Sequence, residues 1–197
     1  MKLKISIFIL LYLVFLYGTI RIFLADINYV AARENIRVGK ADIALNHIEK
    51  AILYNKNEPR YFLELGKIYT AIAAGKDLNL TKKTKANAIA ALEHARKLNP
   101  KNLLVLRNSI AVYYFLAFND ISTTADLSKV DKEYLKITKK YFQEVKSTYK
   151  NDLGVIVLIA PFEKNLGLEE EFDKSIQAIK LIRPDILEWY PPIRTIL

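Results

Sequence analysis

The chain has 197 residues, of which 52% are hydrophobic, and its formal net charge is +9. Because it contains no cysteine, disulfide bridges and thiolate metal sites are excluded. A basic protein of this size can favour acidic proteins, anionic glycans, lipid headgroups or nucleic acid, and the charge alone does not choose among them.

The N-terminal segment is apolar. Residues 5–20 carry no charge, and after Arg21 the apolar run continues to residue 25. At about 1.5 Å per residue, residues 5–25 reach roughly 30 Å, which is enough to cross a hydrocarbon core. A cleaved signal peptide would also start with lysines and an apolar stretch, but Phe23-Leu24 does not supply the small residues of a cleavage site. We therefore predict an uncleaved single-pass signal anchor over residues 1–25.

The charges on either side of this anchor bear on its orientation. Lys2, Lys4 and the free amino group favour a cytoplasmic N-terminus. Basic residues from Arg33 onward pull the other way, but they belong to a predicted folded helix. We predict that the following domain is extracytoplasmic, with a cytoplasmic domain as the alternative.

The clearest helical pattern after the anchor lies in residues 59–102, where two amphipathic helices are predicted to face each other. Large apolar residues and a glycine recur at helical spacing in the first helix, and small residues flank a leucine in the second. These positions are Phe62, Leu65, Gly66 and Tyr69, then Ala88, Leu92 and Ala95. The order large-x-x-Leu-Gly-x-x-Tyr, then Ala-x-x-x-Leu-x-x-Ala, resembles the tetratricopeptide repeat, a helix–turn–helix unit of about 34 residues.

This resemblance implies a stack of such units, because one unit cannot bury its apolar face alone. The predicted fold class is all-α: an N-terminal transmembrane helix followed by an α-solenoid of about four repeats. The repeat domain covers residues 26–185, and residues 186–197 form a capping tail. The repeats are expected at residues 26–58, 59–102, 103–152 and 153–185.

Matching second-helix positions mark the other repeats. Those in the first repeat are Ala44, Ile48 and Ala51, those in the third are Thr138, Phe142 and Val145, and those in the fourth are Phe172, Ile176 and Ile179. Gly39 lies where the first repeat turns, and glycine permits the left-handed conformation that a helix end often needs.

Several local features depart from a regular array. The second repeat carries about ten extra residues between its helices, around positions 75–84. In the third repeat, the first helix is expected to run on to Phe118, before a polar loop over residues 119–130 and a second helix over residues 131–150. Pro161 should kink or shorten the first helix of the fourth repeat. In the tail, Trp189 and Tyr190 are expected to cover the last apolar face.

A second resemblance concerns the whole arrangement of an apolar span that runs directly into helical repeats. This arrangement is similar to the C-terminal end of some bacterial O-antigen ligase or polymerase family proteins. The residues that suggest it are Ala25-Asp26, Ala51, Glu58-Pro59, Tyr61, Leu65-Gly66 and Tyr69. The multi-span membrane body that would carry glycan chemistry is absent from the sequence, so the resemblance implies an envelope polysaccharide context and no glycosyl-transfer activity.

No catalytic constellation is recognisable in the sequence. The only histidines, His47 and His94, lie in separate predicted repeats, and the acidic run at residues 169–173 is expected to open a helix after Gly167. No phosphate-binding loop or nucleophile elbow is present. We predict a protein that is not an enzyme and has no catalytic, cofactor-binding or metal-binding residues.

The candidate site is a surface. In tetratricopeptide arrays the first helices line a groove for extended peptides, so the resemblance implies a peptide-binding groove here. Arginine pairs well with carboxylates, which would suit an acidic peptide. The alternative is that these charges form a solvated face. The candidate residues are Tyr29, Arg33, Arg37, Arg60, Leu63, Lys67, Arg107 and Tyr114.

Two further basic areas are recognisable. One comprises Lys82, Lys83, Lys85, Arg96, Lys97 and Lys101, and the other runs from Lys129 to Lys150. Nucleic acid fits poorly as a partner of a chain with a predicted membrane anchor, and acidic residues interrupt the second area. Anionic lipid headgroups fit at least as well, because the domain would be tethered close to a bilayer.

The sequence as a whole predicts a membrane-anchored scaffold that mediates protein–protein interaction at the bacterial cell envelope without catalysis. Its partner would be a protein, either an acidic peptide segment or a membrane complex. The alternative is an accessory or C-terminal portion of an O-antigen or envelope polysaccharide ligase or polymerase system.

Overall fold

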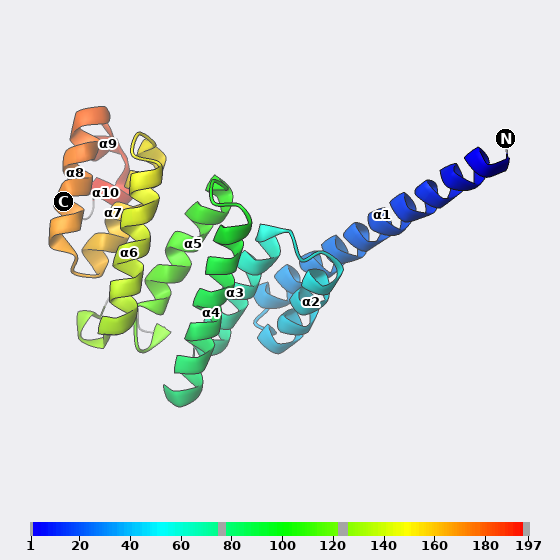
Figure 1. The fold of residues 1–197 in the computed structure, drawn as a ribbon. Helices are drawn as coiled ribbons and strands as arrows, with labels where there is room; N and C mark the ends of the chain where they lie inside the picture. Colours follow the sequence, from blue (N-terminus) through cyan, green and yellow to red (C-terminus); the bar gives the residue numbers. More distant parts are fainter. Residues whose placement is uncertain (1, 75–77, 122–125, 195–197) are drawn as a thin grey trace.

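The computed structural model describes residues 2–74, 78–121 and 126–194, and over these residues it is built from helices, with one isolated β-bridge between Phe118 and Val130 (Figure 1). The helices are α1 (Lys2–Arg37), α2 (Ala41–Tyr54), α3 (Pro59–Ala73), α4 (Leu78–Leu98), α5 (Leu103–Leu116), η2 (Leu127–Lys129), α6 (Lys132–Thr148), α7 (Leu153–Asn165), α8 (Glu169–Ile182), α9 (Ile186–Trp189) and α10 (Pro191–Arg194).

Helix α1 runs without a break from the apolar N-terminal segment into the packed part of the molecule. Its N-terminal part projects away from all other helices (Figure 1), and Ala25 is the first fully buried residue along it. By length and composition, its stretch from residue 5 to residue 37 could span a membrane. One continuous helix therefore joins the predicted anchor to the first helical hairpin.

The remaining helices pack mainly with their neighbours in the chain. The pairs α1/α2, α3/α4, α5/α6 and α7/α8 lie together and follow one another in a row (Figure 1). The first members of successive pairs also touch, α3 against α5 and α5 against α7. Within the described ranges, the second members of successive pairs have no comparable contact. The first helices therefore lie closer together than the second helices.

Alanines allow the two helices of a pair to approach closely, as the sequence predicts. Ala88 and Ala95 are fully buried and Leu92 is 2% exposed. A Cβ atom added to Gly66 would lie 2.8 Å from Leu92 Cδ2, so α3 and α4 meet where only glycine fits without a shift. The corresponding residues of the other pairs are also buried: Ala44, Ile48, Ala51, Thr138, Phe142, Val145, Phe172, Ile176 and Ile179.

Two glycines provide the turns within hairpins. Gly39 between α1 and α2 has φ = +76°, and Gly167 between α7 and α8 has φ = +68°. Both angles fall in the left-handed region that side chains with a Cβ rarely adopt. The predicted role of Gly39 is confirmed.

Two expected loops differ from the structure. Residues 78–84 are not an insertion between helices but the first two turns of α4, because they include no glycine or proline and Thr81 Oγ1 donates to the backbone oxygen of Ala73, at 3.3 Å. Residues 75–77 lie outside the described residues. Helix α5 ends at Leu116 rather than at Phe118, since the backbone of Phe118 pairs with Val130.

The C-terminal half brings two more corrections. Helix α7 continues past Pro161 to Asn165, so the proline does not end the helix, and the alternative, a kink at Pro161, stays a prediction. Trp189 is 57% exposed and does not cover the last apolar face. Ile193 is fully buried there against α7 and α8, and Tyr190 packs partly on the same cluster, so the turn α10 is what closes the core.

Candidate binding groove

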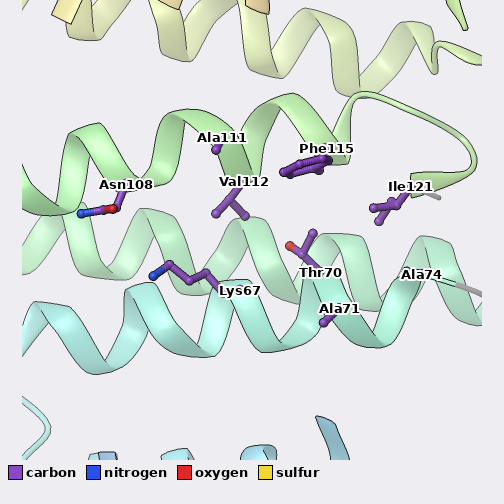
Figure 2. Close-up of a pocket in the computed structure, with 9 residues that line it drawn as sticks. All are labelled: Lys67, Thr70, Ala71, Ala74, Asn108, Ala111, Val112, Phe115 and Ile121. Carbon is purple, nitrogen blue, oxygen red and sulfur yellow. The ribbon is translucent and has the colours of Figure 1, made fainter. Parts of the chain in front are cut away.

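A hollow lies between α3 and α5 (Figure 2). Its volume is about 440 Å³. Figure 2 shows one wall formed by side chains of α3, the other by side chains of α5, and Ile121 at one end. The residues that line it are Lys67, Thr70, Ala71, Ala74, Asn108, Ala111, Val112, Phe115 and Ile121.

A second hollow of about 550 Å³ lies on the other side of α5, towards α7. It is lined by Leu103, Leu104, Arg107, Asn108, Ala111 and Leu158. Asn108 and Ala111 line both hollows, so the two lie next to each other on either side of the exposed face of α5. We call the combined depression the α5 groove.

The helical register explains why the α5 groove is open in the middle. Leu104, Asn108, Ala111 and Phe115 follow one another at helical spacing, so they share one face of α5. The large apolar side chains Leu104 and Phe115 stand at the two ends of this face, 56% and 37% exposed, whereas Asn108 and the small Ala111 lie between them. Ala71 on α3 is also small, which leaves the space between the helices open.

The charge of the α5 groove is positive. Among the described residues that line it, Lys67 and Arg107 are charged, one in each hollow, and none is acidic. Lys67 Nζ lies 3.2 Å from a carboxylate oxygen of Glu64, which is 4% exposed, so this lysine is partly neutralised. Arg107 is exposed and lies beside Gly154 at the start of α7. The groove therefore combines apolar surface with cationic groups at its edge.

Of the eight residues that the sequence predicts for the site, two line the α5 groove: Lys67 and Arg107. Leu63 and Tyr114 do not face an open surface, since they are 4% and 5% exposed. Both lie in the core cluster that joins the middle helices, because α3 and α5 are covered on more than one side. Their predicted place in a groove is wrong.

Three further predicted residues form a separate cluster where α1 meets α3. The guanidinium groups of Arg33 and Arg60 lie 5.7 Å and 5.9 Å from the centre of the Tyr29 ring. Tyr29 itself packs against Tyr61, with ring centres 5.2 Å apart. Arg37 pairs with Glu34 at 2.8 Å on an exposed surface. None of these residues lines either hollow.

The sequence did not single out the residues that form most of the groove, namely Ala71, Asn108, Ala111, Phe115 and Leu158. Alanine at helical spacing looks like a core position, and only the position of α3 and α7 beside α5 shows that Ala111 faces a depression. Asn108 could have indicated an exposed face of α5, since this polar residue interrupts the apolar sequence of the helix.

Not all basic side chains of the predicted area around residues 82–101 are exposed and unpaired. Lys85 is 2% exposed and donates from Nζ to the backbone oxygen of Phe118, at 2.7 Å. Burial lowers its pKa, and Asp131 nearby partly offsets this effect. Arg96 forms ion pairs with Glu93 and Glu144. These two residues hold α4 to its neighbours rather than face a partner.

The most deeply buried acid is Glu163, which is fully buried in α7. Its carboxylate accepts hydrogen bonds from Lys146 Nζ on α6 and from Ser175 Oγ on α8, both at 2.6 Å. The carboxylate therefore links α6, α7 and α8 through hydrogen bonds in the core. The acidic run at the start of α8 is structural in the same way, since Glu171 pairs with Lys139 at 2.6 Å.

Metal ligands are not gathered anywhere in the described ranges, where no group of three or more His, Cys, Asp or Glu side chains could hold an ion. His47 Nδ1 lies 3.1 Å from Asn28 Oδ1, and His94 packs against Phe62 with the rings tilted and their centres 4.2 Å apart. Both histidines have packing partners in separate hairpins. In comparisons with known proteins, no family model, curated protein or solved structure matches the chain.

Proposed function

We propose that this protein is a membrane-anchored scaffold of tetratricopeptide-like hairpins, that it acts by binding rather than by catalysis, and that it holds a protein partner in the α5 groove. The observation that carries the proposal is the pair of neighbouring hollows that share Asn108 and Ala111 on α5. Such a depression suits an extended segment that runs across several helices.

The lining of the groove suggests the chemistry of the partner. Exposed Leu104 and Phe115 offer apolar contacts, and Asn108 offers a side-chain amide that can both donate and accept hydrogen bonds. Arg107 and Lys67 favour carboxylates. We therefore propose an extended peptide segment that carries apolar side chains and at least one acidic group.

The membrane anchor keeps the groove close to other membrane proteins. An anchored groove meets membrane partners at a raised effective concentration, so a modest affinity is sufficient for assembly. The proposed arrangement places the N-terminus in the cytoplasm and the hairpins outside, at the cell envelope. A topology reporter fused to the C-terminus tests this: activity of a reporter that works only outside the cytoplasm supports it, and activity of a cytoplasmic reporter overturns it.

The partner itself can be sought with the full-length protein in its own membrane. After chemical crosslinking and affinity purification, we expect a specific partner with the wild type and its loss with the double variant Lys67→Glu/Arg107→Glu. The matched control is Lys132→Glu/Lys136→Glu, which reverses two exposed charges on α6 away from the groove. Equal recovery of the partner with both double variants would contradict binding in the α5 groove.

A further inference from the structure

The last turn of helix α2, just before the loop to α3, touches α1 inside the apolar segment. Arg21 Nη2 donates to the backbone oxygen of Leu53 at 2.9 Å, and the Arg21 guanidinium lies 5.8 Å from the centre of the Tyr17 ring. The side chain of Leu53 points away from the protein and is 73% exposed. One corner of the packed region is thus fixed at the level of Arg21.

The length of the apolar segment places this corner relative to a bilayer. Between Lys4 and Arg21 there are 16 residues, which span about 24 Å as a helix. A hydrocarbon core is about 30 Å thick and needs about 20 residues. If α1 spans the membrane, Arg21 cannot lie far outside the core, and its charge must reach the headgroup layer. The turn that Arg21 holds then lies in that layer too.

A hollow of about 420 Å³ opens at this corner between α1 and the turn. It is lined by Gly18, Arg21, Ile22, Tyr54, Asn55, Lys56 and Asn57. The lining combines two cations, two side-chain amides and a tyrosine, which is the composition typical of a membrane interface and of phosphate recognition. Gly18 has no side chain to narrow it, and a Cβ atom built there would meet nothing within 4 Å.

The two cations at the hollow are not neutralised by the protein. Within the described ranges, no ion pair joins Arg21 or Lys56 to a carboxylate. The nearby acids are engaged elsewhere: Glu58 pairs with Arg60 at 2.8 Å, and Asp26 accepts a hydrogen bond from the Tyr61 hydroxyl at 2.6 Å. Two positive charges in the headgroup layer therefore lack an acidic counterpart.

We propose that this corner is a binding site for the headgroup of an anionic phospholipid, with Arg21 and Lys56 on the phosphate and Leu53 in the adjacent acyl region. The inference rests on the proposed anchoring of α1 and does not depend on the α5 groove. Binding at the corner fixes the orientation of the hairpins on the membrane, because α1 and the turn are parts of one packed unit. The site thus adds lipid recognition to the anchor.

The absence of cysteine allows a direct test with the full-length protein in bilayers. A fluorophore on Leu53→Cys reports on lipids at the corner, and one on exposed Asn151→Cys, in the turn between α6 and α7, is the matched control. We expect nitroxide-labelled phosphatidylglycerol to quench the first probe more strongly than nitroxide-labelled phosphatidylcholine. No such preference is expected at the control position.

Charge removal then identifies the residues responsible. In Arg21→Gln/Lys56→Gln, the preference for phosphatidylglycerol should fall about 30-fold, since two basic groups at an anionic surface are removed. Lys56→Gln alone, which leaves Arg21 and its bond to Leu53, should lower it about fivefold. Lys101→Gln/Lys150→Gln removes two exposed charges from other turns and should leave it unchanged.

The possible outcomes distinguish a failure of the proposed lipid site from a failure of the proposed anchor. Protein that floats with the vesicles but is quenched equally by both lipids, or whose preference survives in the double variant, would overturn the lipid site and leave the anchor intact. Protein that does not float with vesicles would overturn both.

Discussion

The ammonium group of Lys85 on α4 donates to the backbone oxygen of Phe118, 2.7 Å away, just beyond the end of α5. The same ammonium lies 4.2 Å from the centre of the Tyr134 ring on α6. A lysine that is 2% exposed thus joins three helices at the point where the second and third hairpins meet.

Replacement of Lys85 by methionine keeps the apolar stem but removes the donor to Phe118 and the cation on Tyr134. We expect a loss of about 2 kcal/mol in the free energy of unfolding, because a buried carbonyl is left without its partner. Denaturant unfolding of the full-length protein in detergent micelles, followed by circular dichroism, measures this. Lys83→Met, at an exposed position on the same helix, should change stability by less than about 0.5 kcal/mol, and an equal loss in both variants would contradict the assigned role.

Gly66 and Leu92 provide a test of how closely α3 and α4 pack. Gly66→Ala places a methyl group 2.8 Å from Leu92 Cδ2, so we expect destabilisation by about 1–2 kcal/mol despite the better helix propensity of alanine. In a Leu92→Ala background the space is open, and the same substitution should instead stabilise by up to about 1 kcal/mol. A double-mutant cycle in unfolding free energy measures the change of sign. The same sign in both backgrounds would show that the two side chains do not compete for this space.

Stability should fall in alkaline solution because of buried tyrosines. Burial raises the pKa of Tyr113 and of Tyr141, whose rings stack with centres 3.9 Å apart. A tyrosine whose pKa is higher in the folded chain than in the unfolded chain stabilises the fold fully at pH values below the ordinary tyrosine pKa of 10.0. Above that pH this stabilisation is lost, because the unfolded chain releases the proton before the folded chain does. Each tyrosine contributes up to about 1.4 kcal/mol per pH unit.

The contribution of buried Lys85 to stability changes with pH in the opposite direction. Burial lowers the pKa of its ammonium group, so the free-energy cost of burying the charge disappears as the pH rises. The tyrosines outnumber it, so a net loss is expected above about pH 10. Unfolding free energies measured from about pH 8 to pH 11 test this, and Tyr113→Phe should make the alkaline decline less steep. A decline of equal slope in the wild type and in Tyr113→Phe would contradict the assignment.

Substitutions of Glu163 and Lys146 test whether their buried ion pair stabilises the packing of α6, α7 and α8. Glu163→Ala removes a fully buried carboxylate and leaves Lys146 with Ser175 Oγ but without a carboxylate to balance its charge, which should cost about 3–5 kcal/mol of unfolding free energy. Glu163→Met/Lys146→Met removes both charges and should cost less than the single substitution. The exposed pair Glu170–Lys174 is the matched control, and Glu170→Ala should leave the free energy of unfolding nearly unchanged, because water screens an exposed ion pair. A double variant less stable than Glu163→Ala would contradict this role.

The helical class and the packed faces were predictable because they depend on local spacing. Ala88, Leu92 and Ala95 share one face of any helix that contains them, whatever surrounds it, and all three are buried. The same spacing identified the inward face of α8 through Ile176 and Ile179.

Features that depend on contacts between distant segments were not predictable in the same way. Lys85 looks like a surface residue until Phe118, which is 33 residues away, supplies its partner. Leu63 and Tyr114 look like residues of an open face when each helix is taken alone, whereas neighbouring helices cover them from a second side. The α5 groove depends on the spacing between α3, α5 and α7, which no single helix encodes.

The proposed function depends most directly on occupation of the α5 groove, and site-specific photocrosslinking from Ala111 tests this. With a photoreactive amino acid at position 111 of the full-length protein in its own membrane, we expect a discrete protein adduct, and Ala71→Trp, which fills the facing wall, should abolish it. The same amino acid at exposed Ala90 on α4 is the control and should give no such adduct. An adduct at position 111 that persists with Ala71→Trp, or that forms equally from position 90, would contradict the proposal.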